Sequence, residues 1–117
     1  MAITTPWKGV PRKGPVSSSL TSSAKPVFMY YVYFLLLKNG NIYTGSSDDL
    51  RRRIAEHQNG KVKSTQYFRP VELIGYEAYL IKSDAARREK FFKTTEGKRL
   101  FRQQYKDILS RVRPIIR

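Results

Sequence analysis

The sequence lacks cysteine altogether, which excludes disulfide bonds, thiolate zinc sites and a cysteine nucleophile. It also lacks any apolar run close to the roughly 20 residues that a membrane-spanning helix requires. The longest such run, Val32 to Leu37, has the length of a buried strand. We therefore expect a soluble intracellular protein, either cytoplasmic or associated with the nucleoid, with no membrane partner.

Sequence motifs of several enzyme classes are missing as well. There is no glycine-rich loop with an adjacent lysine, the loop that binds phosphates in P-loop nucleotidases. There is no cluster of His, Asp and Glu at the spacing of a zinc site, and no G-x-S-x-G elbow of a serine hydrolase. The side chains left for chemistry are one His, eight Tyr, nine acidic residues and many Arg.

Acidic residues are scarce, and both ends of the chain have none. Against 23 Lys and Arg there are only nine Asp and Glu, which gives a net charge of +14. Such a charge favours nucleic acid as the partner, because each neutralised phosphate releases condensed counterions. We expect DNA rather than RNA. Charge alone also leaves open an acidic membrane surface, or a role in solubility only.

The chain has room for one domain and two basic tails. Residues 1–28 are rich in Ser, Pro and Lys without a sustained hydrophobic period, so we interpret them as a flexible tail. Residues 29–109 form the expected domain, and residues 110–117 a second basic tail. The first tail has three possible origins: a nucleic-acid-binding arm, an organelle targeting segment, or a remnant of cloning.

The domain begins with a predicted β-hairpin. Met29 to Leu37 is aromatic and apolar throughout, as a strand buried on both faces would be. Asn39-Gly40 favours the positive φ angles of a tight turn, and Ile42 to Gly45 reads as the returning strand.

The rest of the domain sequence predicts three helices and one more strand. Helices are predicted over residues 48–58, 83–93 and 98–110, the second capped by Ser83-Asp84. A third strand is predicted over residues 71–80, with Val71, Leu73, Gly75, Glu77 and Tyr79 on one face. The order β-β-α-β-α-α predicts an α/β (α+β) fold with a three-stranded, mainly antiparallel sheet and helices on its faces.

Five side chains stand out as candidates for chemistry, although each has an ordinary explanation. Arg53 and His57 share one helical face, four residues apart, but a solvated helix surface explains them equally well. Tyr33 and Tyr43 lie on neighbouring strands, where sheet packing is the usual role. Glu89 stands among basic residues, where a surface ion pair is the usual finding.

Taken together and in order, these positions resemble the GIY-YIG nuclease family. Tyr31-Val32-Tyr33 stands in place of the first tripeptide, and Tyr43-Thr44-Gly45 in place of the second. The segment Asp49 to His57 is similar to the family's helix, in which an Arg precedes a His by four residues. Glu89 matches the acidic metal ligand. The resemblance covers about Tyr31 to Lys93, and small single-domain bacterial members are the most similar.

The resemblance implies an endonuclease that uses a divalent metal, Mg²⁺ or Mn²⁺. Glu89 would hold the metal, which polarises the scissile phosphate. Tyr43 would be the general base, with Tyr33 ordering the water beside it. Arg53 would stabilise negative charge on the phosphate. His57 would orient a tyrosine, relay a proton or touch a phosphate.

Three departures from the family pattern accompany the match. Tyr31 replaces the glycine of the first motif, Thr44 replaces the aliphatic centre of the second, and the family's late asparagine has no counterpart after Glu89. The five retained positions favour an active nuclease. The alternative is a non-catalytic nucleic-acid-binding protein of the same fold, such as an RNA-binding component of a ribonucleoprotein particle, which the basic tails would suit.

Nucleic-acid contacts are expected from basic and aromatic residues outside the catalytic set. The predicted contacts are Arg52, Lys61, Lys63, Tyr67, Arg69, Lys98 and Arg102. Cations in the loop over residues 61–69 would pair with phosphates while an aromatic ring stacks on an unpaired base. Alternatively, Tyr67 and Phe68 only pin this loop to the domain. No sequence-reading motif is present, so we expect preference for nucleic-acid structure rather than sequence.

Overall fold

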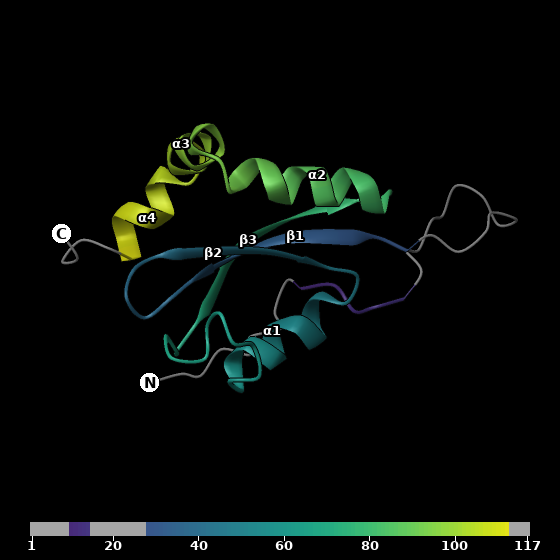
Figure 1. The fold of residues 1–117 in the computed structure, drawn as a ribbon, viewed down its shortest axis with the longest axis horizontal. Coiled ribbons are helices and arrows are strands. Elements are labelled where there is room, and N and C mark those ends of the chain that lie inside the picture. Colours follow the sequence, from purple (N-terminus) through teal and green to yellow (C-terminus); the bar gives the residue numbers. More distant parts are fainter. Residues whose placement is uncertain (1–9, 15–27, 113–117) are drawn as a thin grey trace, which may run out of the picture.

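The computed structural model describes residues 10–14 and 28–112. In this part of the chain a three-stranded antiparallel sheet lies between α1 on one face and α2, α3 and α4 on the other (Figure 1). The elements are β1 (Tyr30–Leu36), β2 (Ile42–Ser47), α1 (Leu50–Gln58), β3 (Glu72–Tyr79), α2 (Lys82–Phe92), α3 (Thr95–Gln104) and α4 (Lys106–Val112). The predicted fold class is thus confirmed. None of the helices described is long and apolar enough to cross a membrane.

Strand β1 is the centre of the sheet, and its side chains supply both hydrophobic cores. The strand order is β2-β1-β3, and residues Val32 to Leu35 have no exposed surface. Side chains alternate across a strand, so Tyr33 and Leu35 pack toward α1 while Val32 and Phe34 pack toward α2 and α3. A continuous apolar run suits a strand that is covered on both faces.

The predicted hairpin is confirmed, but its turn is longer than a two-residue turn. The backbone N–H of Gly40 donates to the carbonyl of Leu37 at 2.9 Å, and that of Leu37 donates to Asn41 at 2.9 Å. Gly40 has a φ of +88°, whereas no residue other than glycine has a positive φ in the described ranges. This is a three-residue loop in which only the glycine takes the left-handed conformation.

A β-bulge in β3 overturns the predicted face of this strand. Phe34 pairs with Gly75, but the next residue, Leu35, pairs with Leu73, so Ile74 is an extra residue. Leu73 packs with the α1 side of the sheet, and Ile74 packs with the α2 side. Strict alternation from Val71 to Tyr79 was therefore a wrong prediction, because a bulge shifts the alternation by one residue.

Two predicted helix ends also need correction. Helix α2 begins at Lys82, with Ile81 at the cap position and no side-chain cap, so Ser83-Asp84 does not cap it. The single helix predicted over residues 98–110 is two helices that meet at Tyr105. The Tyr105 ring stacks on Phe101, with centroids 4.4 Å apart. Leu109, beyond the break, is buried against the same side of the sheet.

Part of the predicted N-terminal tail packs on the domain. Val10 is buried in the α1-side core, and its carbonyl accepts a hydrogen bond from Arg51 Nε at 3.1 Å. Lys13 pairs with Asp48 at 3.0 Å. The rest of the tail predicted over residues 1–28 lies outside the described residues. Of the second predicted tail, residues 110–112 belong to α4.

Gly97 allows α3 to pack closely on the end of α2, and we predict that Gly97→Ala destabilises the protein. A Cβ at this position would overlap the carbonyl group of Phe91. The cost of overpacking, about 1–3 kcal/mol, should exceed the roughly 1 kcal/mol that alanine gains in helix propensity. Urea unfolding measures the change, with the exposed Gln103→Ala as the control on the same helix. A stabilised Gly97→Ala would contradict the close packing.

Candidate active site

The centre of the candidate site is a buried hydrogen bond between β1 and α1. The hydroxyl of Tyr33 lies 2.9 Å from Nε2 of His57, and neither side chain has exposed surface. Tyr33 points to the α1 face of the sheet, and His57 lies in the last turn of α1. His57 is therefore neither a surface histidine nor a phosphate contact. Its hydrogen bond to Tyr33 suits the role of orienting a tyrosine, and a proton relay through the same bond stays a prediction.

Thr65 completes this arrangement from the loop after α1. Its Oγ1 lies 2.8 Å from Nδ1 of His57, and its side chain is fully buried. Arg53 also hydrogen-bonds Tyr33, and a guanidinium can only donate. In the neutral tautomer that carries its proton on Nδ1, the Tyr33 hydroxyl donates to Nε2 and the Nδ1–H group donates to Thr65 Oγ1.

Burial sets the protonation states of both rings. The pKa of His57 is lowered to about 4, first by burial and second by the positive charge of Arg53. The pKa of Tyr33 is raised, first by burial and second by the neighbouring Tyr43, while Arg53 opposes this. Near neutral pH the imidazole is uncharged and the Tyr33 phenol is protonated.

Tyr43 and Gly45 extend the site along β2. The Tyr43 ring lies 5.0 Å from the His57 ring and 6.3 Å from the Tyr33 ring, centroid to centroid, and is partly exposed. Gly45 pairs with Tyr33 in the sheet, and a Cβ there would overlap the Tyr33 hydroxyl. The glycine of the second tripeptide is thus required by the close approach of the buried phenol.

Arg53 is held at the rim by a carboxylate of its own helix. Its Nη1 donates to Glu56 at 2.9 Å, and about a third of its side chain is exposed. Arg52 pairs with the same Glu56 at 3.0 Å and with Asp49 at 3.5 Å. Arg53 can therefore reach both Tyr33 and solvent, whereas Arg52 is engaged with acids on the helix surface.

Glu89 approaches from α2, on the other face of the sheet. One carboxylate oxygen accepts a hydrogen bond from Ser46 Oγ at 2.6 Å, and the other pairs with Lys93 at 2.9 Å. Its charge also contributes to the raised pKa of Tyr33, although less than burial does. Ser46 follows Gly45 on β2, so this edge strand joins the two halves of the site. Glu89 is bound to no arginine in the described residues.

Around Glu89 the described residues offer a divalent cation a single carboxylate. No group of three His, Cys, Asp or Glu that could enclose a metal is found in the residues that the structure describes. A single carboxylate suits Mg²⁺, which commonly takes its remaining oxygen ligands from water and substrate phosphate. Lys93 occupies one carboxylate oxygen, so a cation would compete with this ion pair.

The predicted nucleic-acid contacts fall into separate groups. Lys61, Lys63, Tyr67 and Arg69 are exposed on the loop after α1, Tyr67 by 81%. The buried Val62 and Thr65 anchor this loop, so Tyr67 does not. Arg69 stabilises the loop by donating to the carbonyl of Gln66 at 3.0 Å. Lys98 and Arg102 lie elsewhere, on α3.

Comparison with known families agrees with this geometry. The model of the GIY-YIG catalytic domain matches residues 29–106, which is more than half of the chain. The chain belongs to the GIY-YIG family. GIY-YIG domains are nuclease domains, and Tyr43 and Gly45 of the second tripeptide lie against the buried Tyr33 of this one.

The relatives of this GIY-YIG domain include small bacterial proteins named UPF0213. One from Staphylococcus epidermidis is 42% identical over 66 residues, which are 56% of this chain and 80% of that protein. One from Streptococcus agalactiae is 38% identical over 80 residues, 66% of this chain and 91% of that protein. The solution NMR structure of the UPF0213 protein from Bacillus halodurans is 34% identical, with a TM-score of 0.44, and the match covers 65% of this chain and 84% of that one.

Sequence reasoning missed three residues of this GIY-YIG site: Ser46, Glu56 and Thr65. Each acts through a residue that the sequence did single out, by a hydrogen bond or ion pair. Ser46 directly follows the second tripeptide and Glu56 directly precedes His57, so nearness in sequence was a usable signal. Thr65 lies within the irregular loop between α1 and β3, where no hydrophobic periodicity singles it out.

The buried neutral His57 should make stability depend on pH. The unfolded state takes up a proton near pH 6.5, whereas the folded state does so only near pH 4. Stability is therefore complete above pH 6.5 and falls as the pH is lowered toward 4, by on the order of 3 kcal/mol. Urea unfolding across this range should show the loss, and His57→Gln should reduce it. An equally steep loss in His57→Gln would place its origin in other groups.

Proposed function

We propose that this protein is a metal-dependent endonuclease that hydrolyses phosphodiesters of DNA, with preference for structure over sequence. The observations that carry the proposal are the hydrogen bond that Ser46 of β2 donates to Glu89 and the packing of Tyr43, on the same strand, against the His57 ring. The family supports nuclease chemistry, and the net charge of +14 supports a polyanionic substrate. The cytoplasm or the nucleoid is the proposed place of action.

The two tyrosines have different tasks in this proposal. Tyr33 is fully buried, so we assign it to positioning rather than to ordering the attacking water. Tyr43 is partly exposed, and it is the phenol that would take the proton of the nucleophile. Arg53 would bind the phosphate, because its planar fork matches two oxygens and opposes the charge that develops there.

Glu89 would hold the divalent metal, Mg²⁺ or Mn²⁺. Such a cation polarises the scissile phosphate and stabilises the leaving oxygen. Ser46 orients the carboxylate by its hydrogen bond, and Lys93 balances the carboxylate charge. A surface that only bound nucleic acid would gain nothing from a carboxylate at this position, because the carboxylate repels phosphate.

Glu89→Gln should abolish cleavage and leave binding intact. We expect a loss of about 100-fold or more in the cleavage rate of branched and single-stranded DNA with Mg²⁺, since the metal ligand is removed. Glu96→Gln is the matched control, because Glu96 is exposed and pairs only with Arg99 in the described residues. If binding is measured but wild type cleaves neither DNA nor RNA, the non-catalytic alternative holds instead.

Replacing Tyr33 and Tyr43 one at a time by phenylalanine should affect stability in one case and cleavage in the other. Tyr33→Phe leaves the buried Nε2 of His57 without its hydrogen-bond partner, so it should cost about 1–3 kcal/mol of stability. Tyr43→Phe should slow cleavage and change stability little. Urea unfolding and single-turnover cleavage of both variants measure the two effects. Full cleavage by Tyr43→Phe would remove it as the general base.

A further inference from the structure

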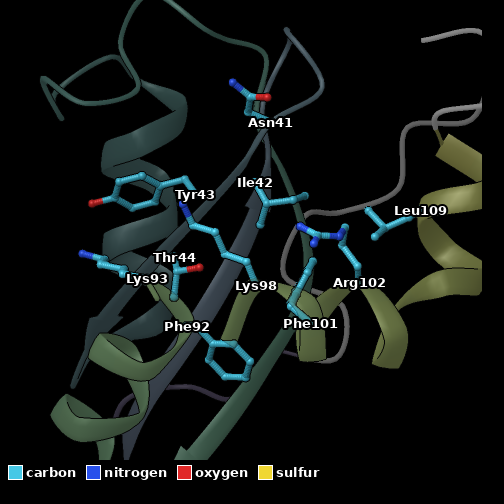
Figure 2. Close-up of a pocket in the computed structure, with 10 residues that line it drawn as sticks. All are labelled: Asn41, Ile42, Tyr43, Thr44, Phe92, Lys93, Lys98, Phe101, Arg102 and Leu109. Atoms are coloured by element: carbon cyan, nitrogen blue, oxygen red, sulfur yellow. The ribbon is translucent and has the colours of Figure 1, made fainter. Parts of the chain in front are cut away.

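A groove of about 530 Å³ lies between β2 and the helices α2, α3 and α4, on the sheet face opposite α1 (Figure 2). It begins at the candidate active site. Tyr43 is one of its lining residues, and so is Lys93, the ion-pair partner of Glu89. The groove therefore borders the candidate active site.

Two cations reach into this groove without an acidic partner. Lys98 and Arg102 extend from α3 toward β2 in Figure 2. Neither forms an ion pair within residues 10–14 and 28–112, whereas Arg99 on the same helix pairs with Glu96 at 2.7 Å. Arg99, the neighbour of Lys98 on α3, does not line the groove. The positive charge of Lys98 and Arg102 is thus available to an outside anion.

The remaining walls of the groove are largely apolar. Ile42 of β2, Phe101 of α3 and Leu109 of α4 line it, together with the polar Thr44 of β2 and Asn41, which directly precedes β2 (Figure 2). A phosphate backbone alone gains no favourable contact from an apolar wall. A nucleobase has a flat apolar face, and it exposes that face to a protein only when it is unstacked.

We propose that this groove binds one unpaired nucleotide next to the scissile phosphate. The base packs on the apolar wall, and the phosphate pairs with Lys98 and Arg102. This inference rests on the proposed function and narrows its substrate to DNA with a single-stranded segment at the cut, such as a flap, an overhang or a junction.

Binding in the presence of chelator tests the groove apart from cleavage. The probes are a blunt labelled duplex, the same duplex with a single-stranded extension, and the same extension made of abasic nucleotides. The full-length wild type should bind the extended duplex about 10-fold or more tightly than both others, because base stacking contributes to the affinity. Equal affinity for normal and abasic extensions would overturn the proposal, since the groove would then contact only the sugar-phosphate backbone and not the bases.

A pair of double variants with the same change in charge makes the test specific. Lys98→Gln/Arg102→Gln should lose the preference for the extended duplex, and the slope of log K against log salt should fall by about 1.5. Arg87→Gln/Arg99→Gln should keep the preference, because both arginines pair with acids away from the groove. A preference that survives in Lys98→Gln/Arg102→Gln would overturn the proposal. Cleavage with Mg²⁺ is measured separately, so absent cleavage by a protein with the expected binding would count against the nuclease alone.

Discussion

The buried hydrogen bond between Tyr33 and His57 joins β1 to α1, and burial keeps the imidazole uncharged near neutral pH. Protonation would end the role of Nε2 as the acceptor of the Tyr33 hydroxyl proton, so the hydroxyl would have to reorient. The same protonation would place an added charge in a site without exposed surface, which is costly. Because Thr65 bonds the other ring nitrogen, one neutral histidine connects β1, α1 and the following loop.

Strand β2 joins chemistry from the two faces of the sheet because it is an edge strand. Neighbouring side chains on a strand point to opposite faces, so Tyr43 lies on the α1 side while Ser46 meets Glu89 on the α2 side. Gly45 lies between them without a side chain, and Tyr33 fills the space that this leaves. A ligand at the edge can therefore contact groups from both faces at once, which a central strand would not allow.

The parts of this structure that were predictable are those with a local signal. The hairpin followed from an apolar run and a turn around Gly40, and the catalytic candidates followed from the order of residues along the chain. The bulge at Ile74 and the break at Tyr105 were not predictable, because a regular apolar pattern continues through both and only tertiary packing interrupts it. Thr65 was missed because its partner, His57, lies across an irregular loop.

The position of Glu89 favours chemistry over simple binding. In a domain this basic, a carboxylate beside a groove that carries Lys98 and Arg102 weakens the attraction for phosphate. Lys93 offsets that charge, and Ser46 fixes the carboxylate in one orientation. A solvated surface acid needs no such orientation, since exposed ion pairs contribute little to stability. The fixed, partly buried carboxylate beside the groove therefore supports the proposal that a cation binds between Glu89 and the phosphate.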